Sequence, residues 1–237
     1  MTLKSNQGVR KNPIELLCQQ EAGRLSWLVP VRHSRMAENP FAFFRGAAVV
    51  MAADLARNPH SGVMVQLCGD AHLLNFGFYG SPERQLLFDI NDFDETHPGP
   101  FEWDVIRLAT SLLLAGSSLG LSEKQQQKVC RRGVQTYAEA MGALAAMPFF
   151  EMWVAKLPLE DLMKQRARGS LKSHLKQVTA MALQRDSRQA VRKLCEVDAS
   201  GTLIFRNQPP LIWRYSLLPD EALSGMDWRH RIDMIFA

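Results

Sequence analysis

The chain has 237 residues, of which 46% are hydrophobic, 22% charged and 8% aromatic, a composition that predicts a globular protein with one core. It excludes disordered, collagen-like and coiled-coil proteins. Lys and Arg number 28 and Asp and Glu 24, so the net charge is only +4, and the basic residues are scattered along the chain. We therefore expect no nucleic-acid partner.

The cysteines and the N-terminus indicate the cellular compartment of the protein. Cys18, Cys68, Cys130 and Cys195 lie 50 or more residues apart, without zinc-finger spacing or a disulfide framework. The polar N-terminus carries no apolar signal region, and no apolar stretch reaches a bilayer-spanning length. The sequence therefore predicts a cytoplasmic protein with no membrane contact.

The first segment, residues 1–62, is predicted to be helical. Asn12 is a favourable N-cap and Pro13 suits a first helical turn, so a helix is expected over Ile14–Trp27. A second, almost wholly apolar helix is predicted to begin near Pro40 and to run through Phe41–Leu55.

The second segment, residues 63–110, contains two predicted strands. A short apolar run over Val63–Cys68 and a second one over Gln85–Ile90 have the length and texture of strands. A loop is expected over Gly69–Gly77, and the cluster His97–Pro100 is predicted to break regular structure.

The third segment, residues 111–237, is predicted to be mainly helical, which makes the fold class α+β and predominantly helical. Ser122 and Gln125 have the spacing of a capping box. The helices expected from Glu102 onward are Trp103–Leu119, Ser122 to about Met147, Leu171–Val197 and Met226–Phe236, with an extended stretch over Thr202–Arg206.

Acidic and amide side chains follow both predicted strands. Asp70 comes directly after the first strand, Asn75 lies five residues later, and Asp92 lies at the end of the second strand. Phosphoryl transfer needs this arrangement, because one carboxylate orients the attacking hydroxyl while an amide oxygen and a second carboxylate hold magnesium against the phosphates. We expect Asp70 to be the catalytic base, and Asn75 and Asp92 to be Mg²⁺ ligands.

The carboxylate that binds metal after the second strand depends on where that strand ends. Side chains alternate between the two faces of a strand, so Asp89 points away from Asp92 and Asp94. All three converge only if the strand ends by Asn91. We choose Asp92, with Asp94 as a candidate second metal ligand.

The spacing D-x-x-x-x-N, followed by an apolar strand that ends in Asp, resembles the protein-kinase-like phosphotransferases, and most closely their aminoglycoside and choline kinase branch. This resemblance implies the helical lobe of that fold with a small strand pair, ATP and Mg²⁺ as cofactors, and a small-molecule substrate that the sequence does not identify. It also implies that Asp104, at a helix start, accepts backbone N–H groups of the catalytic loop as a structural brace.

Five longer motifs mark the first half of the chain. They are R-M at 35–36, N-P-F-A-F-F-R-G at 39–46, V-Q-L-C-G-D-A-H-L-L-N-F-G at 65–77, S-P-E-R at 81–84 and F-D-I-N-D-F-D-E-T at 88–96. With these motifs the whole chain resembles a bacterial family of uncharacterised proteins, domain of unknown function 2252. The resemblance implies that the chain is the N-terminal half of such a protein, truncated before a Gly-rich segment and a strand lysine that follow in the family. The nucleotide-gripping lobe is then missing, and a separately encoded second lobe is a candidate partner.

Two features depart from the kinase pattern. Cys68 stands two residues before Asp70, where kinases commonly carry His, so the loop must be supported differently. No Gly-rich phosphate loop and no strand lysine precede Asp70.

Two residues have alternative roles. His72 is a candidate for cofactor or metal binding, or it forms a hydrogen bond within its loop. Arg45 either binds a phosphate of the cofactor or pairs with a buried carboxylate, for which Glu95 and Asp54 are the candidates.

Two other functions compete with the phosphotransferase. One is a metal-dependent hydrolase, in which Asp70, His72, Asp89 and Asp92 bind one or two divalent ions that activate water. The other is a non-catalytic remnant that depends on a partner and folds on it through an apolar surface.

Overall fold

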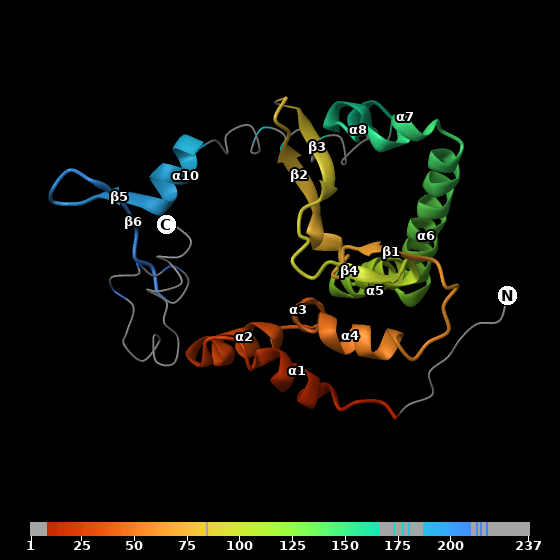
Figure 1. Ribbon diagram of the computed structural model, residues 1–237, viewed down its shortest axis with the longest axis horizontal. Helices are drawn as coiled ribbons and strands as arrows, with labels where there is room; N and C mark the ends of the chain where they lie inside the picture. The colour runs from red at the N-terminus through yellow and green to blue at the C-terminus, as the bar shows by residue number, and fades with distance from the viewer. Residues whose placement is uncertain are drawn as a thin grey trace.

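The computed structural model describes residues 9–83, 85–165 and 187–209, together with residues 173, 177, 180, 212, 214 and 217. In Figure 1 the N-terminal helices lie along one side, below a central layer of short strands and α5, and the hairpin of β2 and β3 rises from that layer. The prediction of a mixed, predominantly helical chain with small strand pairs is confirmed for the described residues.

The N-terminal segment is broken into more helices than predicted. Helix α1 (Pro13–Glu21) begins at the Asn12 cap as expected, but it ends before Gly23, where the chain turns. A single 3₁₀ turn, η1 (Ser26–Leu28), then leads into α2 (Val29–Met36). Helix α2 was not predicted, because its polar sequence has no apolar period.

The predicted second helix is two helices, α3 (Pro40–Gly46) and α4 (Ala48–Leu55). They are separated at Ala47, whose φ of −118° and ψ of 36° interrupt the helical backbone. A side chain at Gly46 would collide with Met36 of α2, so this glycine allows α2 to pack directly against α3.

The strands form separate antiparallel pairs. Strand β1 (Met64–Leu67) pairs with β4 (His97–Pro100), and β2 (Phe76–Gly80) pairs with β3 (Leu86–Ile90). The predicted strands β1 and β3 are therefore present but are not neighbours in one sheet.

The sequence predictions for β2 and β4 were wrong. Strand β2 was assigned partly to a loop, and β4 to a break, because it contains two prolines and a glycine. Proline is tolerated in β4 because this strand has a partner on one side only.

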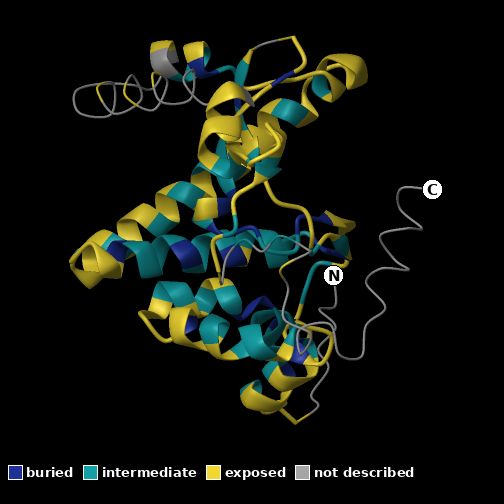
Figure 2. Ribbon diagram, turned by 90° about the vertical axis from the view of Figure 1, so that its left-hand side faces the viewer, coloured by how far each residue is buried: buried dark blue, intermediate teal, exposed yellow. Residues whose placement is uncertain are grey.

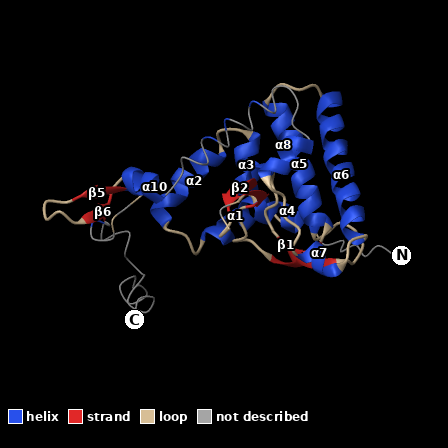
Figure 3. Ribbon diagram, turned by 90° about the horizontal axis from the view of Figure 1, so that it is seen from above, coloured by secondary structure: helices blue, strands red, loops and turns tan. Residues whose placement is uncertain are grey.

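Two long helices support the strands. Helix α5 (Glu102–Ser118) and helix α6 (Glu123–Ala145) lie side by side, as Figure 3 shows from above. The predicted capping box is confirmed, since Ser122 and Gln125 bond to each other's backbone N–H groups.

The later elements are short. After α7 (Phe149–Trp153) and α8 (Leu159–Gln165), the described chain resumes with α10 (Ser187–Leu194) and a hairpin of β5 (Cys195–Val197) and β6 (Leu203–Phe205). Strand β6 confirms the predicted extended stretch, whereas β5 replaces the end of a predicted helix. The expected helix over Met226–Phe236 lies outside the described residues.

The best-buried residues surround the start of the loop after β1. Leu67, His72 and Ser111 have side chains with less than 2% of their surface exposed, and Arg107 is 3% exposed. Figure 2 shows buried segments in the middle of the molecule, where β1, the loop and α5 meet. Within the described residues, no helix is both long enough and apolar enough to cross a bilayer.

Candidate active site

The loop after β1 folds on its own backbone. The carbonyl oxygen of Asp70 accepts from the backbone N of His72 at 2.7 Å and from Nδ2 of Asn75 at 2.8 Å. The backbone N of Asn75 in turn donates to the carbonyl of His72 at 2.9 Å. These bonds place the Asp70 and Asn75 side chains at fixed positions on one compact turn.

Gly69 is required where this loop begins. Its φ is +91°, in the region that L side chains rarely adopt, and a Cβ atom there would collide with the carbonyl oxygen of Glu95. The close approach of the two backbones joins the loop after β1 to the loop after β3.

Helix α5 holds the loop through one face. The Asp104 carboxylate accepts the backbone N–H groups of Cys68 at 2.7 Å and Gly69 at 3.1 Å, which is the contact expected for this residue. The Ser111 hydroxyl accepts the N–H of Leu73 at 2.9 Å. Asp104, Arg107 and Ser111 follow one another at helical spacing, so all three point toward the loop.

Asp70 is anchored through one carboxylate oxygen. Its Oδ1 accepts a 2.5 Å hydrogen bond from Nε of Arg107, while Oδ2 lies 3.5 Å from Nε2 of His72. Arg107 is itself fixed, because it donates to the carbonyl of Phe44 at 2.9 Å and its guanidinium lies 4.1 Å from the centre of the Phe44 ring. The sequence did not indicate this role of Arg107, although its position one turn after Asp104 was a usable signal.

His72 is buried and bonded within its loop, one of its two expected roles. Burial lowers the pKa of His72, and the positive charges of Arg45 and Arg107 act in the same direction, while the Asp70 charge opposes them. Nδ1 of His72 accepts the backbone N–H of Leu74 at 3.2 Å, and its Nε2 lies 3.3 Å from Nε of Arg45 and 3.5 Å from Oδ2 of Asp70.

Arg45 has neither of the carboxylate partners expected from the sequence. Asp54 instead forms two 2.8 Å hydrogen bonds with Arg10, and no ion pair joins Arg45 to Glu95 in the described part of the chain. Nε of Arg45 instead donates to Nε2 of His72 at 3.3 Å. The two terminal N–H groups of the guanidinium, which have no hydrogen-bond partner among the described residues, remain available to a ligand.

Strand β3 ends at Ile90, and the acidic loop that contains Asp92 and Asp94 follows it. The strand therefore ends by Asn91, which is the condition stated for these carboxylates to converge. Asp92 is exposed, and its Oδ1 accepts the backbone N–H of Asp94 at 3.3 Å. The hydrogen bond to Asp92 raises the pKa of Asp94, with smaller contributions from burial and from the negative charges of Asp92 and Asp70. Asp89 stays on the strand opposite Gly77, where its Oδ1 accepts the N–H of Ile90.

Cys68 connects the two loops. Its thiol donates to the carbonyl of Asp92 at 3.2 Å, so this cysteine ties the loop after β1 to the loop after β3. Burial raises the pKa of the Cys68 thiol and keeps it protonated, as a donor must be.

A cleft of about 950 Å³ brings the predicted residues together with the N-terminal helices. The loops after β1 and β3 contribute Asp70, His72, Asn75 and Asp92 to its lining, which we call the Asp70 wall, and α3 contributes Arg45. Asp94 and Asp104 are not among the described residues that line it. Arg24, Arg32 and Arg35 were missed by sequence reasoning and also line the cleft.

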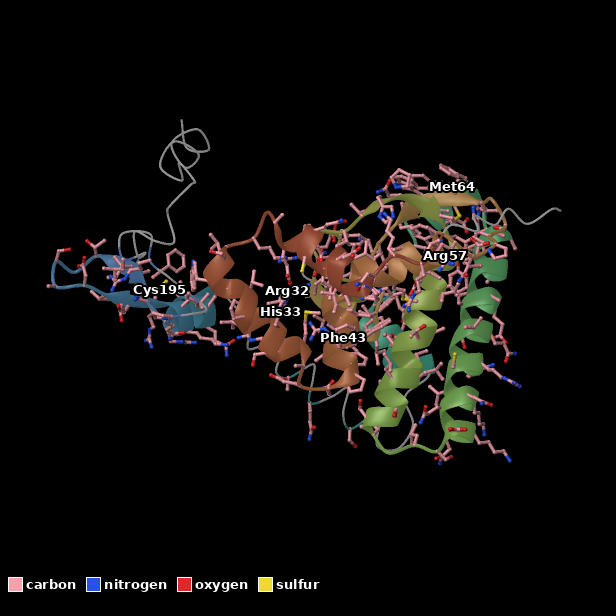
Figure 4. The ribbon with its side chains drawn as sticks, turned by 90° about the horizontal axis from the view of Figure 1, so that it is seen from below. Arg32, His33, Phe43, Arg57, Met64 and Cys195 are labelled. Atoms are coloured by element: carbon pink, nitrogen blue, oxygen red, sulfur yellow. The ribbon has the colours of Figure 1, made fainter. Side chains whose placement is uncertain are left out.

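Figure 4 shows Arg32 and His33 on α2, next to the part of α3 that carries Phe43. Arg32 is partly buried and donates to Glu21 at 2.9 Å and to the carbonyl of Gly46. It therefore joins α1, α2 and α3. Arg32 and Arg35 lie one turn apart on α2, but no local signal in the sequence marks them as residues of the cleft.

The donor set suits a hard cation held by few protein ligands. Nδ2 of Asn75 is used within the loop, which leaves its Oδ1 without a hydrogen-bond donor among the described residues, and the Asp92 carboxylate is exposed in the same cleft. Mg²⁺ is commonly bound through one or two carboxylates together with substrate phosphates. The described residues contain no group of three or more His, Cys, Asp or Glu side chains placed to hold a metal.

Comparison with known proteins places the chain in a family. Residues 24–237 match the family model described as uncharacterized protein conserved in bacteria (DUF2252). This match spans most of the chain, and the expectation that the chain represents only the N-terminal half of longer members stays a prediction. Comparisons with curated proteins and with solved structures gave no match. Because the family model covers far more than half of its length, the chain belongs to the bacterial DUF2252 family.

Proposed function

We propose that this protein is a Mg²⁺- and ATP-dependent phosphotransferase that acts on a small molecule. One observation supports the proposal. Asp70 lies in the loop after β1, Asn75 directly precedes β2 and Asp92 follows β3. All three line the same cleft of about 950 Å³, although β1 belongs to a different sheet from β2 and β3. That volume lies in the range of small-molecule and cofactor sites. Catalysis of phosphoryl transfer consists mainly of positioning and charge stabilisation, and this cleft offers groups for both.

Asp70 is the group that orients the acceptor. Arg107 holds Oδ1 at 2.5 Å, so the carboxylate stays in one orientation, and Oδ2 lies 3.5 Å from Nε2 of His72 and accepts no hydrogen bond from the described residues. Oδ2 is then available to accept the hydrogen of an acceptor hydroxyl or amine. Asp104 contributes by holding the loop backbone, and it does not line the cleft in the described residues.

Asn75 and Asp92 are the residues that would hold Mg²⁺, through the amide Oδ1 and the carboxylate. Bound there, the ion supplies positive charge that neutralises the phosphate oxygens. Asp94 assists Asp92, because its backbone N–H fixes one carboxylate oxygen of Asp92.

Calorimetric titration of the full chain with ATP, with Mg²⁺ or with EDTA, tests the proposal. We expect Mg²⁺-dependent binding that weakens about 10-fold or more in Asp92→Asn, the effect of losing a charged ligand. Asp89→Asn is the matched control, because Asp89 is an exposed carboxylate on β3 outside the described cleft lining. Equal affinity in EDTA, or equal losses in the two variants, would overturn the metal assignment.

Asp70→Asn tests the transfer step. ATP hydrolysis, in which water replaces the unidentified acceptor, should fall at least about 100-fold while Mg²⁺-ATP affinity changes little, because general-base groups contribute about 10²–10⁴ in rate. Unchanged hydrolysis in Asp70→Asn would remove Asp70 from the catalytic role.

A further inference from the structure

The wall of the cleft opposite Asp70 carries positive charge without matching carboxylates. Arg24 follows α1, Arg35 lies on α2 and Arg45 lies on α3, and all three line the cleft and are exposed. No carboxylate of the described residues lies within ion-pair distance of any of them. We call these three residues the arginine wall.

The other arginines of the cleft region are already neutralised. Arg32 pairs with Glu21 at 2.9 Å, and Arg107 pairs with Asp70 at 2.5 Å. The carboxylates of the cleft lining that form no ion pair are Glu38 and Asp92, so the lining holds three arginines without a carboxylate partner and two such carboxylates. A Mg²⁺ ion on Asp92 would make the surplus of positive charge larger.

The arginine wall faces the acidic loops. The charge of Arg45 acts on His72, whose ring lies 3.3 Å from Nε of Arg45, and the charge of Arg24 acts on Glu95 in the loop after β3. A ligand between the two walls therefore meets guanidinium groups on one side and the Asp70 and Asp92 carboxylates on the other. Guanidinium groups favour phosphate, because their N–H groups match its oxygens in pairs.

The backbone under the arginine wall is held in place. Arg32 ties α1 and α2 to the carbonyl of Gly46, and Met36 packs against Gly46 where no side chain intervenes. Arg35 and Arg45 each lie directly beside one of these packed residues, so their positions are set by the α2 and α3 contact. Side chains on a fixed backbone lose less freedom when they bind a ligand.

Resting on the proposed function, we infer that the arginine wall binds the polyphosphate chain of the nucleotide. Three arginines of the N-terminal helices then do the work that kinase-like enzymes assign to a Gly-rich loop and a strand lysine, neither of which precedes Asp70. Arg45, the member nearest to Asp70 through His72, takes the terminal phosphate, where negative charge must be stabilised during transfer.

Binding of tripolyphosphate in EDTA tests this inference apart from the metal site. We expect each of Arg24→Gln, Arg35→Gln and Arg45→Gln to weaken tripolyphosphate about 10-fold, since a hydrogen bond to a charged group is worth about one factor of ten or more. Arg131→Gln on α6 is the control, because Arg131 is exposed and lies outside the described cleft lining. Asp92→Asn should bind metal-free tripolyphosphate as well as the wild type or more tightly, the opposite of its effect on Mg²⁺-ATP.

Further binding experiments determine whether the arginine wall binds the phosphates of the nucleotide or a phosphate of the acceptor. Tripolyphosphate should compete with Mg²⁺-ATP, adenosine should bind without regard to the arginine variants, and Arg35→Lys should recover part of the affinity. Glycerol phosphate that binds alongside Mg²⁺-ATP, and is lost in the arginine variants, would assign the wall to the acceptor and overturn the inference. Equal tripolyphosphate affinity in all arginine variants would also overturn it, and would leave the Asp92 result to decide the proposed function by itself.

Discussion

The two walls of the cleft are built in different ways. On the Asp70 wall nearly every polar group has a partner: Arg107 holds the carboxylate, Asp104 holds two backbone N–H groups, and Ser111 holds a third. On the arginine wall, Arg24, Arg35 and Arg45 have no carboxylate partner in the described structure. The first wall is stabilised by its own contacts, whereas the second keeps its charge for a ligand. Removing the partners that hold the first wall together should therefore affect folding, whereas substitutions on the arginine wall should affect binding.

The largest effect on folding should come from Arg107→Met. Arg107 is 3% exposed, and its loss leaves the Asp70 carboxylate, itself 16% exposed, without its partner. Breaking one side of a buried ion pair costs about 3–5 kcal/mol, so urea unfolding should show a decrease of that size in the free energy of unfolding.

Two further variants make this measurement decisive. Arg107→Met combined with Asp70→Asn should recover part of the loss, because the uncompensated charge is gone. Arg132→Met breaks an exposed pair with Glu139, in which the side chains are 57% and 50% exposed, and should cost no more than about 1 kcal/mol. If Arg107→Met cost no more than Arg132→Met, the Asp70 wall would not depend on this contact.

A smaller loss of stability is expected for Gly69→Ala. Gly69 and Gly62 have similar φ values of +91° and +87°, so alanine at either position carries the left-handed backbone penalty of about 1–2 kcal/mol. At Gly69 the new Cβ also collides with the carbonyl of Glu95, whereas at Gly62 nothing lies within 4 Å. Thermal and urea unfolding of both variants should show the larger loss for Gly69→Ala, and equal losses would mean that the two loops separate without cost.

The contrast between the walls also explains what could be predicted from the sequence. Asp70, Asn75 and Asp92 were found because short strands and the residues that follow them are local features, and helix α6 was found through its capping box. The pairing of β1 with β4 was not found, since a strand with two prolines has no local signature.

The arginine wall could not be predicted from local pattern. Arg24 follows α1 and Arg35 lies on an unpredicted polar helix, and they reach the same cleft as Arg45 only because Met36 packs against Gly46. That contact is tertiary, and a helix with no apolar period gives no indication of the face that it presents. The role of Arg107 was partly visible in the sequence. Its spacing from Asp104 along α5 indicates that both lie on one helix face, but its pairing with Asp70 is a tertiary contact that the sequence does not show.

The smallest effect on folding is expected on the arginine wall itself. Arg24 and Arg35 are exposed and form no ion pair with a described carboxylate, so Arg24→Gln and Arg35→Gln remove charge without leaving a partner uncompensated. Exposed substitutions of this kind stay within about 0.5 kcal/mol of the wild type, and relief of repulsion among the three guanidinium groups favours a slight gain in stability. Urea unfolding at low salt measures this change, since salt screens the repulsion. A loss above about 1 kcal/mol would show that these arginines support the fold, and the two walls would then be alike.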